Sequence, residues 1–230
     1  MSQAFQFEPT LFKYLRDLKK HNERPWFKAS KARYEDELRS PMLHFIESFA
    51  PYLEKVSENF LADARPIGGS LFRIHRDTRF AKDKTPYKTH AGAHFRHLRA
   101  KDVHAPGFYL HMEPGNVFMG AGIWRPDSAT LGKIREAIVA DAKKWKRLST
   151  AKALGNADIS FVGDSLKRPP RGFDPEHPLI EDLKRKDFIL AVNISEKEAL
   201  APDFIKQFAK FCKTAAPVSE FITAALDLEW

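Results

Sequence analysis

The sequence has little cysteine and no long apolar run, and each absence excludes a class of protein. Cys212 is the only cysteine in 230 residues, so no disulfide can form within the chain. A chain of this kind suits a reducing compartment. No stretch approaches the roughly 18 consecutive apolar residues that a membrane-spanning helix needs, and no signal peptide is visible. We therefore expect a soluble, cytoplasmic protein with no membrane partner.

The short motifs that identify common enzyme classes are also missing. The sequence contains no Gly-x-Ser-x-Gly motif, no Walker loop and no dinucleotide fingerprint. It likewise has no zinc-finger spacing and no evident helix-turn-helix. These absences leave open whether the protein is an enzyme, and they identify neither a cofactor nor an oligomeric state.

Aromatic and basic residues are abundant. The chain contains 19 Phe and is 43% hydrophobic, which is enough apolar material for a substantial core. Lys and Arg number 38 against 30 Asp and Glu, which gives a net charge of +8. Such an excess favours an anionic partner, either a nucleic acid or a small anionic ligand. A basic surface that only keeps the protein in solution is the alternative.

The spacing of apolar residues predicts that the N-terminal quarter is helical. Apolar residues recur at helical spacing from Glu8 to Lys20 and again from Trp26 to about Leu61. Pro41 should start a new helix or kink the second one, and Asn22 can cap it.

The hydrophobic period changes from helical to about two near residue 66. Strands are predicted near Leu71–Arg76, Thr89–Arg96, Gly107–Glu113 and Val117–Ile123. Pro114-Gly115-Asn116 is typical of a hairpin turn between the last two. Strands joined by hairpins imply an antiparallel sheet.

Residues 125–230 combine the helical spacing of apolar residues with the alternation that is typical of strands. Asp127 or Ser128 can cap a helix, and Asp203 begins a closing helix that should bend or break at Pro217 and bury Cys212. Between them, short strands are predicted near 159–162 and 188–193, and a helix near 179–184. We predict a single α+β domain over residues 1–230, in which helices flank the central antiparallel sheet: helical over 1–65, mainly β over 66–124 and mixed over 125–230.

The candidate site lies in residues 73–88, which we call the basic segment. It holds six Lys and Arg against two Asp. Arg offers a planar fork for phosphate or carboxylate, and Lys a mobile point charge. We predict that these side chains bind an anion: Arg73, Arg76, Arg79, Lys84 and Lys88. At least two of the three arginines should converge with Tyr87 or Lys88 on a common point.

Other groups of this region have possible roles beside the cations. Asp77, Tyr87 and His111 are the polar groups available for orientation or acid–base work, and Phe80 and Tyr87 could stack on a base or ring. The alternative is internal bracing, in which Asp77 pairs with a neighbouring arginine and Asp83 with a lysine. Two carboxylates cannot neutralise six cations, which favours the anion site.

A group of histidines follows the basic segment. His90 and His94 could share one face of a strand, and Glu113 is a candidate carboxylate for a metal. Gly92 and the strand-like context argue against a metal-binding helix, and no cysteine is near. We therefore expect partly exposed strand histidines and no metal site.

Several motifs resemble one known family. Arg76–Phe80 and Lys84–Lys88 resemble the signature of the family catalogued as domain of unknown function 2461. Further similar motifs occur in order at Asn22–Phe27, Pro106–His111, Gly120–Pro126 and Arg168–Asp174. His90 departs from the pattern, since similar proteins often carry Asn there. The resemblance implies kinship and brings no known activity, cofactor or catalytic residue.

The leading hypothesis is a phosphate- or nucleic-acid-related protein that uses the basic segment. One alternative is an enzyme acting on a small anionic metabolite, which needs a concave pocket over the same cations. The other is a binding module without catalysis. A long exposed basic stripe would favour a polymer, and a few buried cations around a cleft would favour a metabolite.

Overall fold

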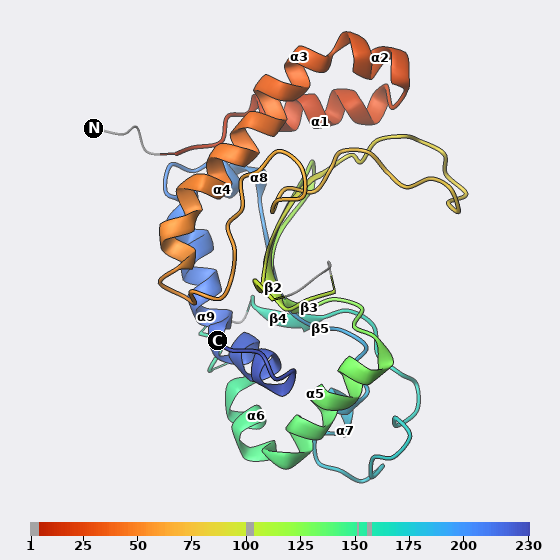
Figure 1. Cartoon of the computed structure of the whole chain (residues 1–230), viewed down its shortest axis with the longest axis vertical. Coiled ribbons are helices and arrows are strands. Elements are labelled where there is room, and N and C mark those ends of the chain that lie inside the picture. The colour runs from red at the N-terminus through yellow and green to blue at the C-terminus, as the bar shows by residue number, and fades with distance from the viewer. Residues whose placement is uncertain (1–4, 100–103, 151, 156–157) are drawn as a thin grey trace.

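Helices from the two ends of the chain pack against one antiparallel sheet (Figure 1). The computed structural model describes residues 5–99, 104–150, 152–155 and 158–230. The helices are α1 (Thr10–Lys20), α2 (Arg24–Ala29), α3 (Lys31–Arg33), the π-helix η1 (Tyr34–Arg39), α4 (Ser40–Leu53), α5 (Ser128–Ala140), α6 (Ala142–Leu148), α7 (Ile180–Leu183), α8 (Glu196–Ala199) and α9 (Phe204–Ala225). The strands are β1 (Ala91–Arg96), β2 (Gly107–Glu113), β3 (Asn116–Ile123), β4 (Ser160–Val162) and β5 (Phe188–Ile194), in the order β1-β2-β3-β5-β4. The predicted α+β class and antiparallel sheet are confirmed.

The second N-terminal helix is shorter than its apolar pattern predicts. It passes through one π-helical stretch just before Pro41, where the Ser40 N–H donates to the Glu35 carbonyl five residues back. Helix α4 then ends at Leu53, so the prediction of helix to Leu61 was wrong. Residues 59–61 instead run along the edge of β1, where the Leu61 N–H donates to the Arg96 carbonyl (3.0 Å). The unpaired backbone groups of that strand edge outweigh the helical pattern.

Asn22 joins the helices to the basic segment rather than capping α2. Its side-chain amide donates to the Tyr87 carbonyl (2.9 Å) and its side-chain oxygen accepts from the Tyr87 N–H (3.0 Å). The residue at the N-cap of α2 is Glu23, which makes no side-chain cap. The capping prediction for Asn22 was therefore wrong, because Tyr87 offers it two backbone partners instead of one.

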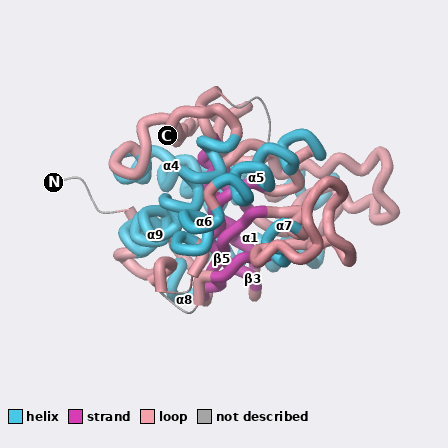
Figure 2. The backbone as a smooth tube through the Cα atoms, turned by 90° about the horizontal axis from the view of Figure 1, so that it is seen from below, coloured by secondary structure: helices cyan, strands magenta, loops and turns pink. Residues whose placement is uncertain are grey.

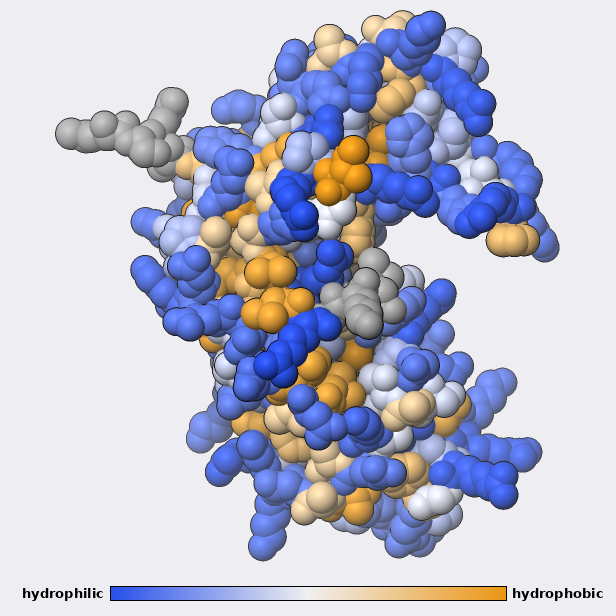
Figure 3. All heavy atoms as spheres, in the orientation of Figure 1, coloured by the Kyte–Doolittle hydropathy of each residue, from blue (hydrophilic) through white to orange (hydrophobic). Residues whose placement is uncertain are grey.

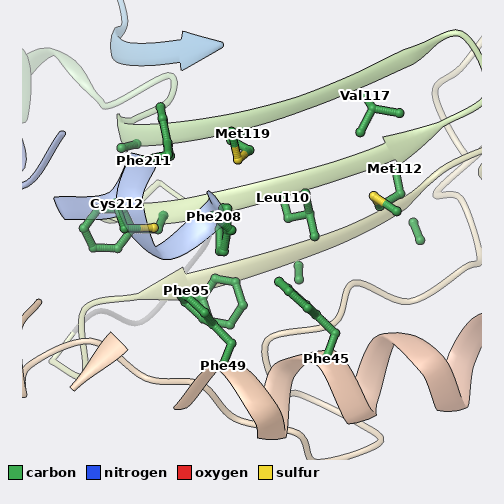
Figure 4. Close-up of a cluster of buried hydrophobic side chains, with 14 of the residues drawn as sticks. Phe45, Phe49, Phe95, Leu110, Met112, Val117, Met119, Phe208, Phe211 and Cys212 are labelled. Carbon is green, nitrogen blue, oxygen red and sulfur yellow. The ribbon is translucent and has the colours of Figure 1, made fainter. Parts of the chain in front are cut away.

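One face of the sheet is apolar throughout and forms the core. Phe95, Leu110 and Met119 on this face pack against phenylalanines of α4 and α9 (Figure 4). Among these, the rings of Phe49 and Phe208 lie 4.7 Å apart. Figure 2 shows α4 and α9 together on one side of the strands. Burying each such ring contributes roughly 2 kcal/mol, so this face fixes where the sheet sits.

The basic segment is extended but forms no regular strand. The prediction of a strand over Leu71–Arg76 was wrong: this stretch makes only isolated bridges, from Leu71 to Ala93 and from His75 to Tyr87. The second bridge folds the basic segment back on itself. In Figure 1 the segment appears as a long yellow loop that extends beside α1–α3.

The C-terminal elements follow their predicted order. Asp127 caps α5 by accepting from the Thr130 N–H (2.7 Å). Helix α9 continues through Pro217, so the predicted alternative of a break there was wrong, and a bend at Pro217 stays a prediction. Cys212 is buried on the apolar face of this helix, as predicted. One cluster of buried side chains contains residues from α1, α4, the sheet and α9, and the single-domain organisation stays a prediction. Among the described residues, no helix is both long and apolar enough to cross a membrane.

Candidate ligand cavity on the polar face of the sheet

Over β1, β2 and β3, the second face of the sheet carries small, aromatic and polar residues instead of aliphatic ones. Along β2 the residues alternate, so that Phe108, Leu110 and Met112 enter the core and the intervening side chains lie on the opposite face. That opposite face carries, across β1, β2 and β3, Gly92, His94, Gly107, Tyr109, His111, Glu113, Phe118, Gly120 and Gly122. This side of the sheet faces a hollow in the molecular surface (Figure 3).

A cavity of about 720 Å³ lies over this face, which we call the sheet cavity. Its size is in the range of pockets that hold small molecules. Half of the lining residues are glycine or carry the large aromatic rings of Phe72, Tyr109, Phe118 and Trp124. Phe72 directly precedes the basic segment, so the lining combines residues of the strands with residues of loops outside the sheet.

Two glycines make the floor of the sheet cavity possible. A Cβ at Gly92 would collide with the Tyr109 hydroxyl, and a Cβ at Gly107 would collide with His94 Nε2. The two larger side chains therefore lie across the neighbouring strand where no side chain stands. This arrangement needs glycine at both positions and leaves space above the rings.

His94 is held neutral in this floor. It is 7% exposed, and its Nδ1 atom has no hydrogen-bond partner within the described residues. Burial, with a smaller repulsion from Arg96, lowers the pKa of His94 to about 4. The expectation of partly exposed strand histidines was wrong for His94, His97 and His111, which are all buried.

A chain of hydrogen bonds runs along β2 at one end of the cavity. The Tyr109 hydroxyl lies 3.0 Å from His111 Nδ1, and His111 Nε2 lies 3.4 Å from a carboxylate oxygen of Glu113. Thr89 Oγ1 donates to the other carboxylate oxygen (3.0 Å). The ring of His90 lies 4.4 Å from that of His111, measured between centroids.

Burial sets the protonation of these groups. It lowers the pKa of His90 to about 4 and also lowers the pKa of His111, where the hydrogen bond to Glu113 opposes the shift only in part. Burial alone would raise the pKa of Glu113, but hydrogen bonds from Thr89 and His111 outweigh it and lower that pKa. Near pH 7 the group consists of two neutral imidazoles beside one carboxylate.

Asp187 positions the opposite rim of the cavity. It is 5% exposed, and its carboxylate accepts from the Arg125 N–H (2.7 Å) and the Asp164 N–H (3.1 Å). These bonds tie together the two loops that carry the lining residues Trp124 and Gly163. The indole of Trp124 is 47% exposed and lies under the Arg125 guanidinium.

Two of the five predicted anion-binding residues reach the sheet cavity. Arg73 and Lys88 both line it. Lys88 Nζ lies 5.0 Å from the centre of the Phe72 ring, and burial followed by repulsion from Arg73 lowers the pKa of Lys88. Within the described part of the chain, neither cation forms a salt bridge. The cavity therefore has two positive charges without an ion-paired carboxylate.

The other three predicted cations lie elsewhere. Arg76 binds Asp83 (2.5 Å) and Thr85, Arg79 binds Asp77 (2.7 Å), and Lys84 donates to the Thr78 carbonyl (2.9 Å). These contacts are the internal bracing considered above, with Arg76 in place of a lysine as the partner of Asp83. The expected convergence of the basic segment on one point does not occur in these contacts.

The predicted orienting residues are also separated from one another. Asp77 is exposed, and the hydrogen bond from Arg79 lowers its pKa to about 2. Tyr87 is buried with its ring stacked 4.1 Å from that of Phe27, measured between centroids, so one face of the ring already has a partner. His111 belongs to the hydrogen-bonded chain on β2. Phe80, in contrast, is 95% exposed and available.

A second cavity of about 670 Å³ lies between α2 and the basic segment. We call it the helix cavity. Its lining includes Arg24, Lys28, Lys31 and Arg76. Lys31 binds Glu35 (2.7 Å), whereas Arg24 and Lys28 form no ion pair among the residues that the structure describes.

Sequence reasoning missed Tyr109, Thr89 and Asp187. The signal for Tyr109 was present, because a period of two along Gly107–Glu113 places every second residue on the face opposite Leu110. No comparable signal marks Asp187, whose partners are backbone groups of distant loops.

The fold and the site thus define an α+β protein with a ligand-sized cavity on the polar face of an antiparallel sheet. The chain belongs to the family described as conserved hypothetical protein (DUF2461), whose model matches residues 10–221. The suspected resemblance is confirmed. No curated protein and no solved structure matches the chain.

Proposed function

We propose that the sheet cavity binds a small anionic molecule with a flat apolar body. The observation that carries the proposal is the pair Arg73 and Lys88, two cations on the wall of an aromatic cavity that form no ion pair with a carboxylate of the described residues. An anionic group placed between them relieves their repulsion and gains charge-assisted hydrogen bonds. The aromatic lining supplies contact area for the rest of the ligand.

This proposal favours the small-metabolite alternative over a polymer. The sheet cavity contains only two cations of the basic segment, and they adjoin a concave wall of rings rather than an open stripe. A few cations around a cleft are the pattern of a small ligand. The neutral histidines and Tyr109 beside them offer hydrogen bonds that fix the ligand's orientation, whether or not a reaction follows.

The test is a comparison of three probes: phenyl phosphate, inorganic phosphate and phenol. We expect phenyl phosphate to bind most tightly in calorimetric titration, because it alone engages both the cations and the rings. Arg73→Gln and Lys88→Gln should each weaken its binding about tenfold, since each removes a charged hydrogen bond worth about 1.5 kcal/mol or more.

Lys82→Gln is the matched control. Lys82 is an exposed cation of the same basic segment and is absent from the lining of both cavities. The Lys82→Gln variant should therefore bind phenyl phosphate with unchanged affinity. Equal affinities for phenyl phosphate and inorganic phosphate, or variants of Arg73 and Lys88 that bind like the wild type, would contradict the proposal.

A second candidate, binding of a nucleic acid, is favoured by the helix cavity. Arg24 and Lys28 are exposed there and form no ion pair with any described residue, and Phe80, in the middle of the basic segment, is exposed and can stack on a base. Such binding would be mainly electrostatic. Oligonucleotide titration separates the two candidates, because the residues concerned differ from those of the sheet cavity.

A further inference from the structure

We infer that His90, His111 and Glu113 form a binding site for a single divalent transition-metal ion, of which Zn²⁺ is the best fit. This site goes beyond the ligand binding proposed above. The three side chains each offer one ligand atom, and these atoms all lie within 4.8 Å of one another. Two imidazoles and a carboxylate are the set of donors that open zinc sites use, with a fourth position left for water or a ligand.

The spacing of the atoms fits a metal. Ligand atoms at about 2.0–2.1 Å from a tetrahedral zinc ion lie about 3.3 Å from one another. His111 Nε2 and the Glu113 carboxylate oxygen are already 3.4 Å apart. The remaining separations, up to 4.8 Å, close by a small rotation of His90, whose ring is only partly buried.

A second layer of side chains already orients two of the ligands. When an ion takes the place of the Nε2 proton that His111 shares with Glu113, the contact between Tyr109 and His111 Nδ1 (3.0 Å) lets Nδ1–H donate to the phenol oxygen, so that Nε2 is the ligand atom. The Thr89 hydroxyl donates to one oxygen of Glu113 (3.0 Å), and the Asn116 side-chain amide makes a longer contact to the other (3.4 Å), which keeps a second lone pair for the ion. Partners of this kind fix tautomer and carboxylate orientation in known metal sites.

An ion bound by these three residues would lie beside the sheet cavity. His90 lines that cavity, and Lys88 is close enough to His90 to affect its electrostatics. A divalent ion with one carboxylate keeps a net positive charge, so its open position would favour an anionic oxygen. The hydrogen-bonded trio acting only as a structural network is the alternative that the test must exclude.

The experiment is titration of the chelator-stripped protein with Co²⁺, followed by displacement with Zn²⁺. We expect one Co²⁺ per chain, with visible absorption bands that Zn²⁺ abolishes. Glu113→Gln, which keeps the shape of the side chain, and His111→Asn should each weaken the affinity by about 100-fold or more. Thr89→Val should weaken it about tenfold, because it removes only an orienting hydrogen bond.

His44→Asn is the control, because His44 is an exposed histidine of α4 and tests adventitious binding. It should leave the affinity unchanged, and circular dichroism should show all variants folded. Absence of Co²⁺ and Zn²⁺ binding, or binding that survives both Glu113→Gln and His111→Asn, would overturn the assignment. Titrating phenyl phosphate in the presence of chelator tests the ligand proposal separately, so the two can fail independently.

Discussion

At the scale of single residues, burial decides what the histidines of this protein do. His94 and His111 lie on the same face of the sheet, yet their neighbours differ. His111 has partners on both ring nitrogens, whereas His94 Nδ1 has none among the described residues. An unpaired buried nitrogen costs about 1–3 kcal/mol, and a charge there would cost more. Protonation of His94 therefore opposes folding.

We expect the stability of the protein to fall in mild acid, in part through His94. Its pKa is near 6.5 in the unfolded chain and about 4 in the folded protein. Between these pH values the unfolded chain binds the extra proton, so the free energy of unfolding decreases as the pH falls from about 6.5 toward 4. The full contribution of this residue is of the order of 3 kcal/mol.

Urea unfolding at several pH values measures the effect. His94→Gln should unfold with a shallower pH dependence than the wild type over this interval, whatever its stability at pH 7. Arg96 and Tyr109, the charged and titratable neighbours of the His94 ring, are present in both proteins, so their own titration cancels in the comparison. Identical slopes for the two proteins would show that His94 is not buried in its neutral form.

At the scale of elements, the sheet combines a filled face with an open one. The filled face is set by aliphatic and aromatic side chains that contact α4 and α9. The open face depends on glycines, because Tyr109 and His94 lie flat only where the adjacent strand has no side chain. Space for a ligand thus depends on glycines in the strands as well as on the loops that carry Phe72, Trp124 and Gly163.

Two alanine substitutions on this face should behave differently. Gly107→Ala should destabilise the protein by about 1–3 kcal/mol, because its Cβ meets His94 and the Phe95 carbonyl oxygen. Gly120→Ala is the matched control, since the nearest atom to its Cβ, Tyr109 Cβ, is at an ordinary 3.7 Å. Thermal unfolding measures both. Equal melting temperatures for the two variants would contradict the packing of His94 over Gly107.

At the scale of the whole molecule, the positive charge is divided between separate places. Arg73 and Lys88 belong to the sheet cavity, while Arg24, Lys28 and Arg76 belong to the helix cavity. Helix α6, with a further group of basic residues, lies at the opposite end of the molecule from α2 (Figure 1). This separation allows the contribution of each group to be measured alone.

If the helix cavity binds nucleic acid, we expect weakly sequence-selective binding whose affinity falls steeply with salt, because bound Lys and Arg displace counterions. Replacing Arg24, Lys28 and Arg76 by Gln should reduce the slope of log K against log salt by about one for each lost phosphate contact. Removing the same charge from α6, by Lys143→Gln, Lys146→Gln and Arg147→Gln, should leave the slope unchanged. Fluorescence titration of duplex and single-stranded oligonucleotides over a series of salt concentrations measures these slopes. No binding at low salt would leave the small-ligand proposal.

The sequence by itself determined the elements whose signal is local. The alternation along 107–113 and 117–123 and the turn at Pro114-Gly115 located the hairpin to within a residue. Asp127 capped its helix as its position indicated, since a cap needs only the next few backbone groups. The family also followed from motifs read in order along the chain.

Only the tertiary structure decided the site, because its residues meet across distant parts of the chain. The dense charge of the basic segment drew attention to Arg79 and Lys84, but neighbouring carboxylates and carbonyls bind both. His90 and Glu113 become neighbours because β1 and β2 pair in one register, and a shift of one residue would move Glu113 to the other face. Register and burial depend on contacts over the whole core, so residue types and local spacing alone could not fix them.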